Sequence, residues 1–224
     1  MHSENQPLPP VTHADAEGLV AVGGVLTIDR LEEAYSKGIF PWYSEEQPVL
    51  WWSPDPRLVL YPENLKIQKS MRPLLNQDVF KVTVNRCFDD VISACAGVPR
   101  KDQDGTWILD EMREVYSKWH RLGKVHSFES WENDELVGGF YGVQQGAVFF
   151  GESMFATKAN ASKFAFIKGV QWLKSKGIRF IDCQQETEHL KRFGAENIER
   201  SKFIEQLGAW KDMEVELSGE HILS

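Results

Sequence analysis

The most informative segment of the chain spans residues 149–155 and reads Phe149-Phe150-Gly151-Glu152-Ser153-Met154-Phe155. It places one carboxylate and one hydroxyl inside an otherwise apolar, aromatic run. Burying a lone carboxylate costs several kcal/mol unless something compensates its charge. Two interpretations of Glu152 therefore stand open. It is either a structural carboxylate that meets a Lys, an Arg or water, or one that binds a cation of a substrate.

This segment closes the last of three strands that the sequence predicts in succession. The residue pattern indicates strands over 125–131, 136–143 and 147–154. The turn sequences Asn133-Asp134 and Gln145-Gly146 would join them as antiparallel neighbours. A helix over 160–176, ended by Gly177, follows, and a short buried strand over 178–183 comes next.

Helical periodicity predicts an earlier helix that Thr27 caps and Gly38 ends. Further helices are expected over 88–95, 112–119, 187–193 and 201–207, and further strands near 80–84 and 214–217. The order of elements from residue 79 onward predicts a GNAT-like acyltransferase domain. The expected fold class is α+β, with a small N-terminal α/β domain over 1–61. A GNAT-like catalytic domain with a mixed, mostly antiparallel sheet would cover 62–224.

The composition is that of a globular protein, with 42% hydrophobic and 26% charged residues. The net charge of −8 argues against indiscriminate binding of nucleic acid over the whole surface. No signal sequence is recognisable, and no run reaches the ~18 apolar residues of a membrane span. The three cysteines form no CxxC pair. These features predict a cytoplasmic protein with reduced thiols.

The segment 66–86 reverses the sign of the charge locally. It carries Lys66, Lys69, Arg72, Lys81 and Arg86 against Asp78 alone. Scattered charge of this kind usually marks a solvated face, but clustered Lys and Arg also bind phosphates. Both interpretations stay open.

Chemistry-bearing residues gather in 151–155 and 180–184. Both segments end strands that flank the 160–176 helix, so we expect them to meet at one mouth of the sheet. The histidines show no HExxH spacing, which disfavours a metal site. Ser153 lacks a Gly-x-Ser-x-Gly elbow. Cys183 would need His189 to fold back as its base, so nucleophilic catalysis is disfavoured as well.

What remains is positioning, with Glu152 holding a cation while Asp182 and Gln184 orient an amine. This arrangement suits transfer of an acyl group to an amine. The loop over 155–162 lacks the glycine pair that cradles a pyrophosphate in acyl-CoA-dependent enzymes of this fold. An acyl-CoA N-acyltransferase and a non-catalytic tRNA- or peptide-binding module are kept as rival interpretations.

Seven ordered motifs extend over most of the chain. They are Phe40-Pro41-Trp42, Leu50-Trp51-Trp52-Ser53-Pro54-Asp55-Pro56-Arg57, Thr106-Trp107-Ile108, Gly138-Gly139-Phe140-Tyr141-Gly142, Phe150-Gly151-Glu152-Ser153-Met154-Phe155, Asn160-Ala161-Ser162-Lys163 and Ile181-Asp182-Cys183-Gln184. Together they resemble the motifs of the leucyl/phenylalanyl-tRNA–protein transferases. The resemblance implies transfer of Leu or Phe, with Met as a further candidate, from aminoacyl-tRNA (Leu-tRNA, Phe-tRNA). The acceptor would be a protein with N-terminal Arg or Lys, which becomes an N-degron. Neither a metal nor a cofactor is implied.

The resemblance also implies roles for individual residues. Gln184, Asp182 and Glu152 would form the catalytic set, with Glu152 meeting the basic acceptor and the other two orienting its α-amine. Trp51 and Trp52 would form an aromatic ledge for the terminal adenosine of the tRNA. Further substrate-binding candidates are Trp107, Tyr116, Phe140, Ser153, Phe155 and Phe166, and the tRNA-binding candidates are Lys66, Lys69, Arg72 and Lys81. This chain has Phe140 and Gly169 where the family often has Met and Phe, which predicts a reshaped pocket.

Overall fold

The computed structural model describes residues 6–98 and 108–223. Its helices are α1 (Ile28–Ser36), α2 (Arg72–Asn76), α3 (Phe88–Ala96), α4 (Asp110–Arg121), α5 (Ala161–Lys176), α6 (Glu188–Lys191) and α7 (Arg200–Trp210), with 3-10 helices η1 (Val11–His13) and η2 (Pro62–Asn64). Its strands are β1 (Leu19–Val22), β2 (Phe40–Pro41), β3 (Leu50–Trp52), β4 (Arg57–Leu60), β5 (Lys81–Val84), β6 (Val125–Glu132), β7 (Glu135–Gln145), β8 (Val148–Ala156), β9 (Phe180–Gln184), β10 (Glu196–Ile198) and β11 (His221–Leu223). The α+β class predicted from the sequence is confirmed.

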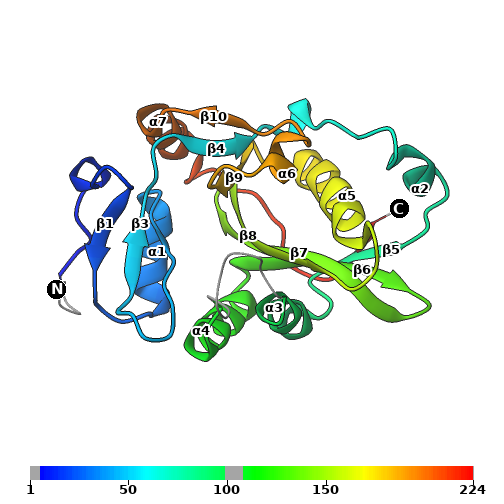
Figure 1. The fold of residues 1–224 in the computed structure, drawn as a ribbon, viewed down its shortest axis with the longest axis horizontal. Helices are drawn as coiled ribbons and strands as arrows, with labels where there is room; N and C mark the ends of the chain where they lie inside the picture. Colours follow the sequence, from blue (N-terminus) through cyan, green and yellow to red (C-terminus); the bar gives the residue numbers. More distant parts are fainter. Residues whose placement is uncertain (1–5, 99–107, 224) are drawn as a thin grey trace.

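An eight-stranded sheet lies at the centre, in the order β10-β4-β9-β8-β7-β6-β5-β11. In it β8 and β9 run parallel, and the other neighbours run antiparallel. The parallel pair requires a long crossover, which α5 supplies. Figure 1 shows α5 on one face of this sheet and α3 and α4 on the other. The sheet is therefore mixed and mostly antiparallel, as predicted.

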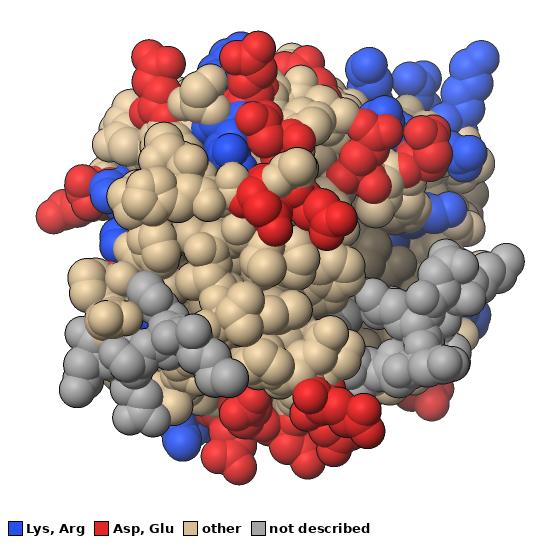
Figure 2. Space-filling view, turned by 60° about the vertical axis from the view of Figure 1, so that its left-hand side comes forward, with Lys and Arg blue, Asp and Glu red and all other residues tan. Residues whose placement is uncertain are grey.

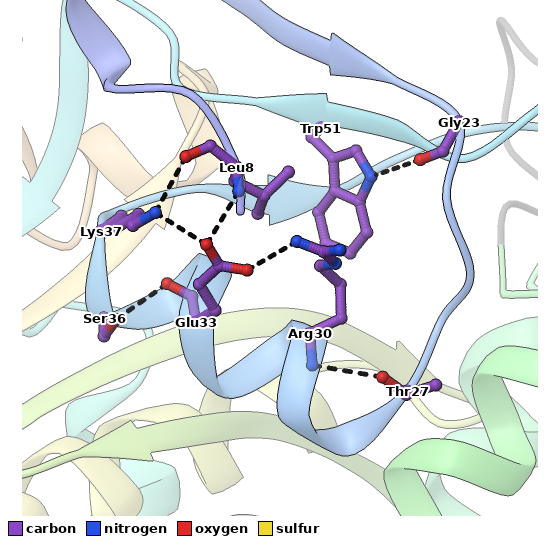
Figure 3. Close-up of polar contacts among 8 residues, drawn as sticks. All are labelled: Leu8, Gly23, Thr27, Arg30, Glu33, Ser36, Lys37 and Trp51. Carbon is purple, nitrogen blue, oxygen red and sulfur yellow. Dashed lines mark hydrogen bonds and ion pairs between the residues drawn. The ribbon is translucent and has the colours of Figure 1, made fainter. Parts of the chain in front are cut away.

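A smaller sheet, ordered β1-β3-β2, lies beside α1 at the N-terminal side of the molecule (Figure 1). The Thr27 hydroxyl caps α1 by accepting a hydrogen bond from the backbone N–H of Arg30. Glu33 accepts a hydrogen bond from the backbone N–H of Leu8 and pairs with Arg30 and Lys37 (Figure 3). These contacts attach the N-terminal segment to the helix.

The two faces of the large sheet carry separate hydrophobic cores. The first joins Tyr35 and Trp51 of the N-terminal unit to Trp119 of α4 and Phe150 of β8. The second lies between the sheet and α5. Because the first core contains residues from both predicted domains, packed side chains hold the small sheet against the large one.

The predicted domain boundary at residue 61 falls after β4. That strand, however, pairs with β9 and β10 in the large sheet. The chain therefore passes from the small sheet to the large one between Trp52 and Arg57.

Most predicted elements are present, including the helices at α3 and α5 and the three strands β6, β7 and β8. The predicted strand over 214–217 is wrong, because those residues form no strand and the last one is β11. Side chains replace a neighbouring strand there: Gln144 donates to the Val215 carbonyl, and Asn85 to the Leu217 carbonyl. Within the described residues, no helix is long and apolar enough to cross a membrane.

Candidate active site

The candidate site opens where β8 and β9 separate. Their parallel pairing ends at Phe150 opposite Asp182, although β8 continues to Ala156 and β9 to Gln184. A cavity of about 400 Å³ lies at this point, lined by parts of both strands. Its volume is in the range of small-ligand sites. The prediction that segments 151–155 and 180–184 meet at one mouth of the sheet is confirmed.

A β-bulge on β8 places Glu152 in this cavity. In the β7–β8 ladder Tyr141 faces Ser153, whereas the next pair joins Gly142 to Gly151. Glu152 is therefore the extra residue of the bulge. A bulge interrupts the strict alternation of a strand and redirects side chains, so the consecutive residues 151–154 all line the cavity.

A second bulge lies opposite the first, on β9. Leu58 faces Gln184 and Val59 faces Asp182, which leaves Cys183 as the extra residue. Gln184 has a φ of 62°, a left-handed conformation that costs a non-glycine residue roughly 1–2 kcal/mol. The Asp182 Oδ1 atom accepts a hydrogen bond from the backbone N–H of Gln184 at 2.8 Å. This bond holds a conformation of the kind that functional sites retain.

Glu152 lies on the polar side of the cavity. Its Oε1 atom accepts hydrogen bonds from the Tyr35 hydroxyl at 2.8 Å and from Gln184 Nε2 at 3.0 Å. Its Oε2 atom is buried and has no hydrogen-bond partner among the described residues. Burial raises the pKa of Glu152 to about 8, although the hydrogen bond from Tyr35 acts in the opposite direction.

The electrostatic surroundings of Glu152 bear on the two interpretations left open above. No ion pair between described residues includes Glu152. Asp182 raises its pKa and Arg57 lowers it, so neighbouring charges act in both directions. The carboxyl group thus has one oxygen held by neutral donors and one buried oxygen without a hydrogen-bond partner among the described residues.

Asp182 lies behind the cavity wall, because both of its oxygens bind Arg57. The Arg57 Nε and Nη2 atoms donate to the carboxylate at 2.8 and 2.7 Å, and both side chains are fully buried. The guanidinium carbon lies 4.8 Å from the ring centroid of Phe40 and 4.5 Å from that of Phe203. In this structure Asp182 therefore contacts Gln184 and Arg57 and does not line the cavity.

The remaining wall of the cavity is largely apolar. It includes Phe40, Trp42, Phe140, Met154, Phe166, Ile181 and Leu190. Three of the substrate-binding candidates implied by the resemblance thus line the cavity, namely Phe140, Phe166 and Ser153. Phe155 does not, since it lies in the core on the other face of the sheet. The reason is strand parity, which turns Met154 and Phe155 to opposite faces.

The two tryptophans predicted to form one ledge differ in exposure. Trp51 has no exposed surface, and its Nε1 atom donates to the Gly23 carbonyl at 3.0 Å (Figure 3). Trp52 is half-buried and donates to the Trp42 carbonyl at 2.7 Å, with the two rings 6.1 Å apart. The ledge is therefore corrected: Trp51 belongs to the core, and Trp42 is the ring that stands beside Trp52 and lines the cavity.

The adjoining aromatic candidate Tyr116 does not line the cavity. Tyr116 is fully buried, and its hydroxyl lies 2.7 Å from that of Tyr35. It therefore reaches Glu152 only through Tyr35, which corrects its assignment as a substrate contact. Trp107 lies outside the described residues.

Cys183 and His189 both line the cavity. Burial, assisted by the charge of Asp182, raises the pKa of the Cys183 thiol well above its usual range. Burial lowers the pKa of His189, and Lys163 and Arg192 add to that shift. A protonated thiol beside a weakly basic imidazole does not suit thiolate chemistry. Among the described residues, no three His, Cys, Asp or Glu side chains are grouped to hold a metal ion.

The four predicted tRNA-binding residues, Lys66, Lys69, Arg72 and Lys81, are all exposed. None forms an ion pair with another described residue. Asp78, the acidic residue of that segment, pairs with Lys168 at 2.9 Å, which compensates its charge. Figure 2 shows how unevenly the charges are spread, with Lys and Arg gathered at the upper right and acidic residues at the top and bottom.

Sequence reasoning missed Tyr35, Arg57 and Trp42 as site residues. Tyr35 lies on the buried face of α1 with Leu31 and Ala34, a periodicity that only indicates packing. Arg57 and Trp42 belong to motifs quoted above, but nothing in those motifs shows which side chains are buried. Their roles depend on contacts between distant segments.

Comparisons with known proteins cover most of the chain. A family model described as leucyl/phenylalanyl-tRNA protein transferase matches residues 59–208, and one for the N-terminal domain of that family matches residues 24–55. A leucyl/phenylalanyl-tRNA–protein transferase of Christiangramia forsetii is 59% identical, over 89% of this chain and 95% of its own length. One of an Anaeromyxobacter species is 54% identical, over 87% of this chain and 83% of its own.

Among solved structures, the resemblance is weak. A conserved protein of unknown function from Bacteroides thetaiotaomicron matches with a TM-score of 0.42 at 13% identity, over 76% of this chain and 60% of that one. A score this low assigns no fold, so the GNAT-like architecture stays a prediction.

Proposed function

The chain belongs to the leucyl/phenylalanyl-tRNA protein transferase family, and we propose that it moves leucine or phenylalanine from charged tRNA to the N-terminal amine of an acceptor protein. The observation that carries this proposal is the meeting of Glu152 and Gln184 in a cavity with a polar and an apolar side. The apolar side suits the transferred side chain, and the polar side suits the amine.

The reaction requires alignment more than activation, because the donor ester already has a ribosyl leaving group. The amine nitrogen attacks the ester carbonyl, and the carbon–nitrogen bond replaces the bond to the ribose oxygen. That oxygen takes up the proton that the amine loses. Since the Gln184 Nε2 atom donates to Glu152, the amide oxygen of Gln184 is left to accept a hydrogen bond from the attacking amine. Asp182 serves as a positioning residue through the backbone of Gln184.

The pocket for Leu or Phe lies against Phe140 and Phe166. The Phe140 ring is stacked on Phe128 at 4.4 Å, and a Cβ added at Gly169 would lie 2.7 Å from Phe140. The absence of a side chain at Gly169 therefore provides space for the ring of Phe140. Apolar pockets separate Leu and Phe from polar residues, but they distinguish single methylenes by only about 1–3 kcal/mol.

The acceptor carries Arg or Lys at its N-terminus in this proposal, and the cation binds the unpaired Oε2 atom of Glu152. The product would be an N-degron. Lys66, Lys69, Arg72 and Lys81 contact the tRNA backbone, and Trp42 with Trp52 offers rings to its terminal adenosine. An enzyme that consumes charged tRNA would work in the cytoplasm.

One assay tests this function against its rivals. Labelled Phe-tRNA is supplied with a peptide that starts with Arg, and label is followed into the peptide. Incorporation supports the proposal. Turnover of acetyl-CoA without incorporation would favour an acyl-CoA N-acyltransferase, which the loop over 155–162 and the family membership do not favour. Binding of tRNA or peptide without either reaction would favour a binding module.

A further inference from the structure

We propose that Tyr35 is a positioning residue, whose hydroxyl holds the Glu152 carboxylate in the geometry and charge state that a cationic acceptor requires. This inference rests on the function proposed above. It adds a group from the N-terminal unit to Glu152 and Gln184, which come from the large sheet.

Four side chains from four elements form one buried chain of hydrogen bonds. The Tyr116 hydroxyl of α4 lies 2.7 Å from the Tyr35 hydroxyl of α1, which lies 2.8 Å from Glu152 Oε1 of β8. Gln184 of β9 reaches the same oxygen at 3.0 Å. Both tyrosines are fully buried, so water does not compete for the two bonds that the Tyr35 hydroxyl forms.

The chemistry of these groups gives the chain one direction. An ionised carboxylate can only accept, so the Tyr35 hydroxyl must donate to Glu152. The Tyr35 oxygen then accepts a hydrogen bond from the Tyr116 hydroxyl. Burial, with the charge of Glu152 second, raises the pKa values of both hydroxyls well above their usual range, so both stay protonated donors. The hydrogen bonds from Tyr35 and Gln184 thus favour the ionised form of Glu152, against the effect of burial.

Tyr35 and Gln184 both donate to Oε1 of Glu152, and neither reaches Oε2. The Oε2 atom of Glu152 is buried and lacks a partner among the described residues. An unpaired buried carboxylate oxygen is unfavourable, and an ammonium or guanidinium group of a substrate would supply the missing donors. Tyr35 and Gln184 therefore both bind Oε1 and leave Oε2 as the oxygen without a donor among the described residues.

The charged and polar groups around Glu152 come from three directions. Tyr35 acts from α1, Gln184 and Asp182 from β9, and Arg57 from β4. Of the groups that favour the ionised form, Tyr35 has the largest influence on the pKa of Glu152. Removing its hydroxyl must raise that pKa beyond its value of about 8.

The test is Tyr35→Phe, which removes one oxygen and keeps the ring. If ionised Glu152 binds the cationic acceptor, kcat/KM for an Arg-starting peptide rises with pH through the pKa of Glu152. In Tyr35→Phe the rise should move upward by about one pH unit, while tRNA affinity is unchanged. Tyr61→Phe is the matched control, because the Tyr61 hydroxyl also donates to a side chain, Gln206, away from the cavity.

The acceptor's own α-amine titrates near pH 8, so two further measurements separate it from Glu152. Direct ¹³C NMR titration of the Glu152 carboxyl should show the same upward shift in Tyr35→Phe, without any substrate. In a Glu152→Gln background, Tyr35→Phe should no longer move the pH profile. The Tyr35→Phe/Tyr116→Phe pair removes both hydroxyls, and it keeps the test valid if the single variant folds poorly.

The outcomes are distinct for the two proposals. A wild-type chain that transfers no amino acid overturns the proposed function, and the NMR titration still decides the role of Tyr35. An active wild type with an unmoved pH profile and an unmoved carboxyl titration overturns the inference. A uniform loss of rate at every pH in Tyr35→Phe, together with an unmoved carboxyl titration, would also overturn it, because the inference requires the charge state of Glu152 to change.

Discussion

Two glutamates are buried in the same sheet, and their carboxyl oxygens differ in the hydrogen bonds that they accept. On β6, Glu129 is fully buried and uses both oxygens: Oε1 accepts from the Ser127 hydroxyl at 2.5 Å and Oε2 from the Thr83 hydroxyl at 2.6 Å. On β8, Glu152 uses one oxygen twice and leaves the other unpaired. Burial raises the pKa of both.

One observation separates the structural carboxyl of Glu129 from the candidate functional carboxyl of Glu152. Burial and a raised pKa are common to Glu129 and Glu152, so neither property distinguishes them. What differs is an unpaired oxygen on a residue that lines a cavity. A carboxyl group whose two oxygens are both hydrogen-bonded has no unpaired acceptor for a ligand. A carboxyl group with an unpaired oxygen is stabilised when it binds a cation.

The largest effect is expected at Gln184, which donates to Glu152 and, in the proposed function, binds the reacting amine. Gln184→Ala removes the amide proposed to align that amine and one of the two donors to Glu152. We expect turnover to fall on the order of 100-fold, with tRNA affinity unchanged. Single-turnover transfer from Phe-tRNA measures this. Wild-type turnover in the variant would remove Gln184 from the site.

The satisfied carboxyl should matter for stability instead. Glu129→Ala leaves the Ser127 and Thr83 hydroxyls without their acceptor, and we expect it to lower the free energy of unfolding by about 2 kcal/mol. Urea denaturation measures the change, and Glu135→Ala, an exposed glutamate on β7, is the control. A loss of acceptor use in correctly folded Glu129→Ala would contradict the distinction between the two glutamates.

A matched pair of amide substitutions compares the two carboxyls on acceptor use. Glu152→Gln should lower kcat/KM for an Arg-starting peptide by about tenfold, because a charged hydrogen bond becomes a neutral one. Glu129→Gln should leave that value unchanged. The ratio of kcat/KM for peptides with basic and neutral first residues is the readout. An unchanged ratio in Glu152→Gln would make Glu152 structural as well.

Binding of the tRNA body should be independent of both glutamates, and the smallest change is expected there. Reversing the charges of Lys66, Lys69 and Arg72 to Glu should reduce the salt dependence of tRNA binding by about one unit of log–log slope per lost phosphate contact. Reversal of Lys118 and Arg121, exposed on α4, and of Lys124, exposed just after it, is the control. An intact slope in the first variant would dismiss the 66–86 segment as a tRNA contact.

The sequence predicted the parts of the fold that local patterns determine. The cap at Thr27 and the periodic apolar residues of α3 and α5 mark helices without reference to the rest of the chain. The pairing of 151–155 with 180–184 was also predictable, because a crossover helix brings its flanking strands together. For these reasons most of the architecture was accessible.

The details of the site were less accessible because they depend on register. The bulges at Glu152 and Cys183 shift side chains by one position, and they exist only through partner strands. The short strand β3 was not predicted, so its alternation could not separate Trp51 from Trp52. Tyr35 and Glu152 are 117 positions apart in the sequence. Their side chains meet only because α1 packs against β8.

The contacts of Arg57 determine when the site can form during synthesis of the chain. Its guanidinium joins Asp182 to the rings of Phe40 and Phe203, and Phe203 lies on α7, among the last elements of the chain to leave the ribosome. We expect a nascent chain that lacks α7 to hold Asp182, and with it Gln184, loosely. Such a chain would be inactive toward the charged tRNAs that surround it during translation. The test is a chain truncated before Arg200 and held on stalled ribosomes. We expect this chain to transfer no amino acid from charged tRNA to an acceptor peptide.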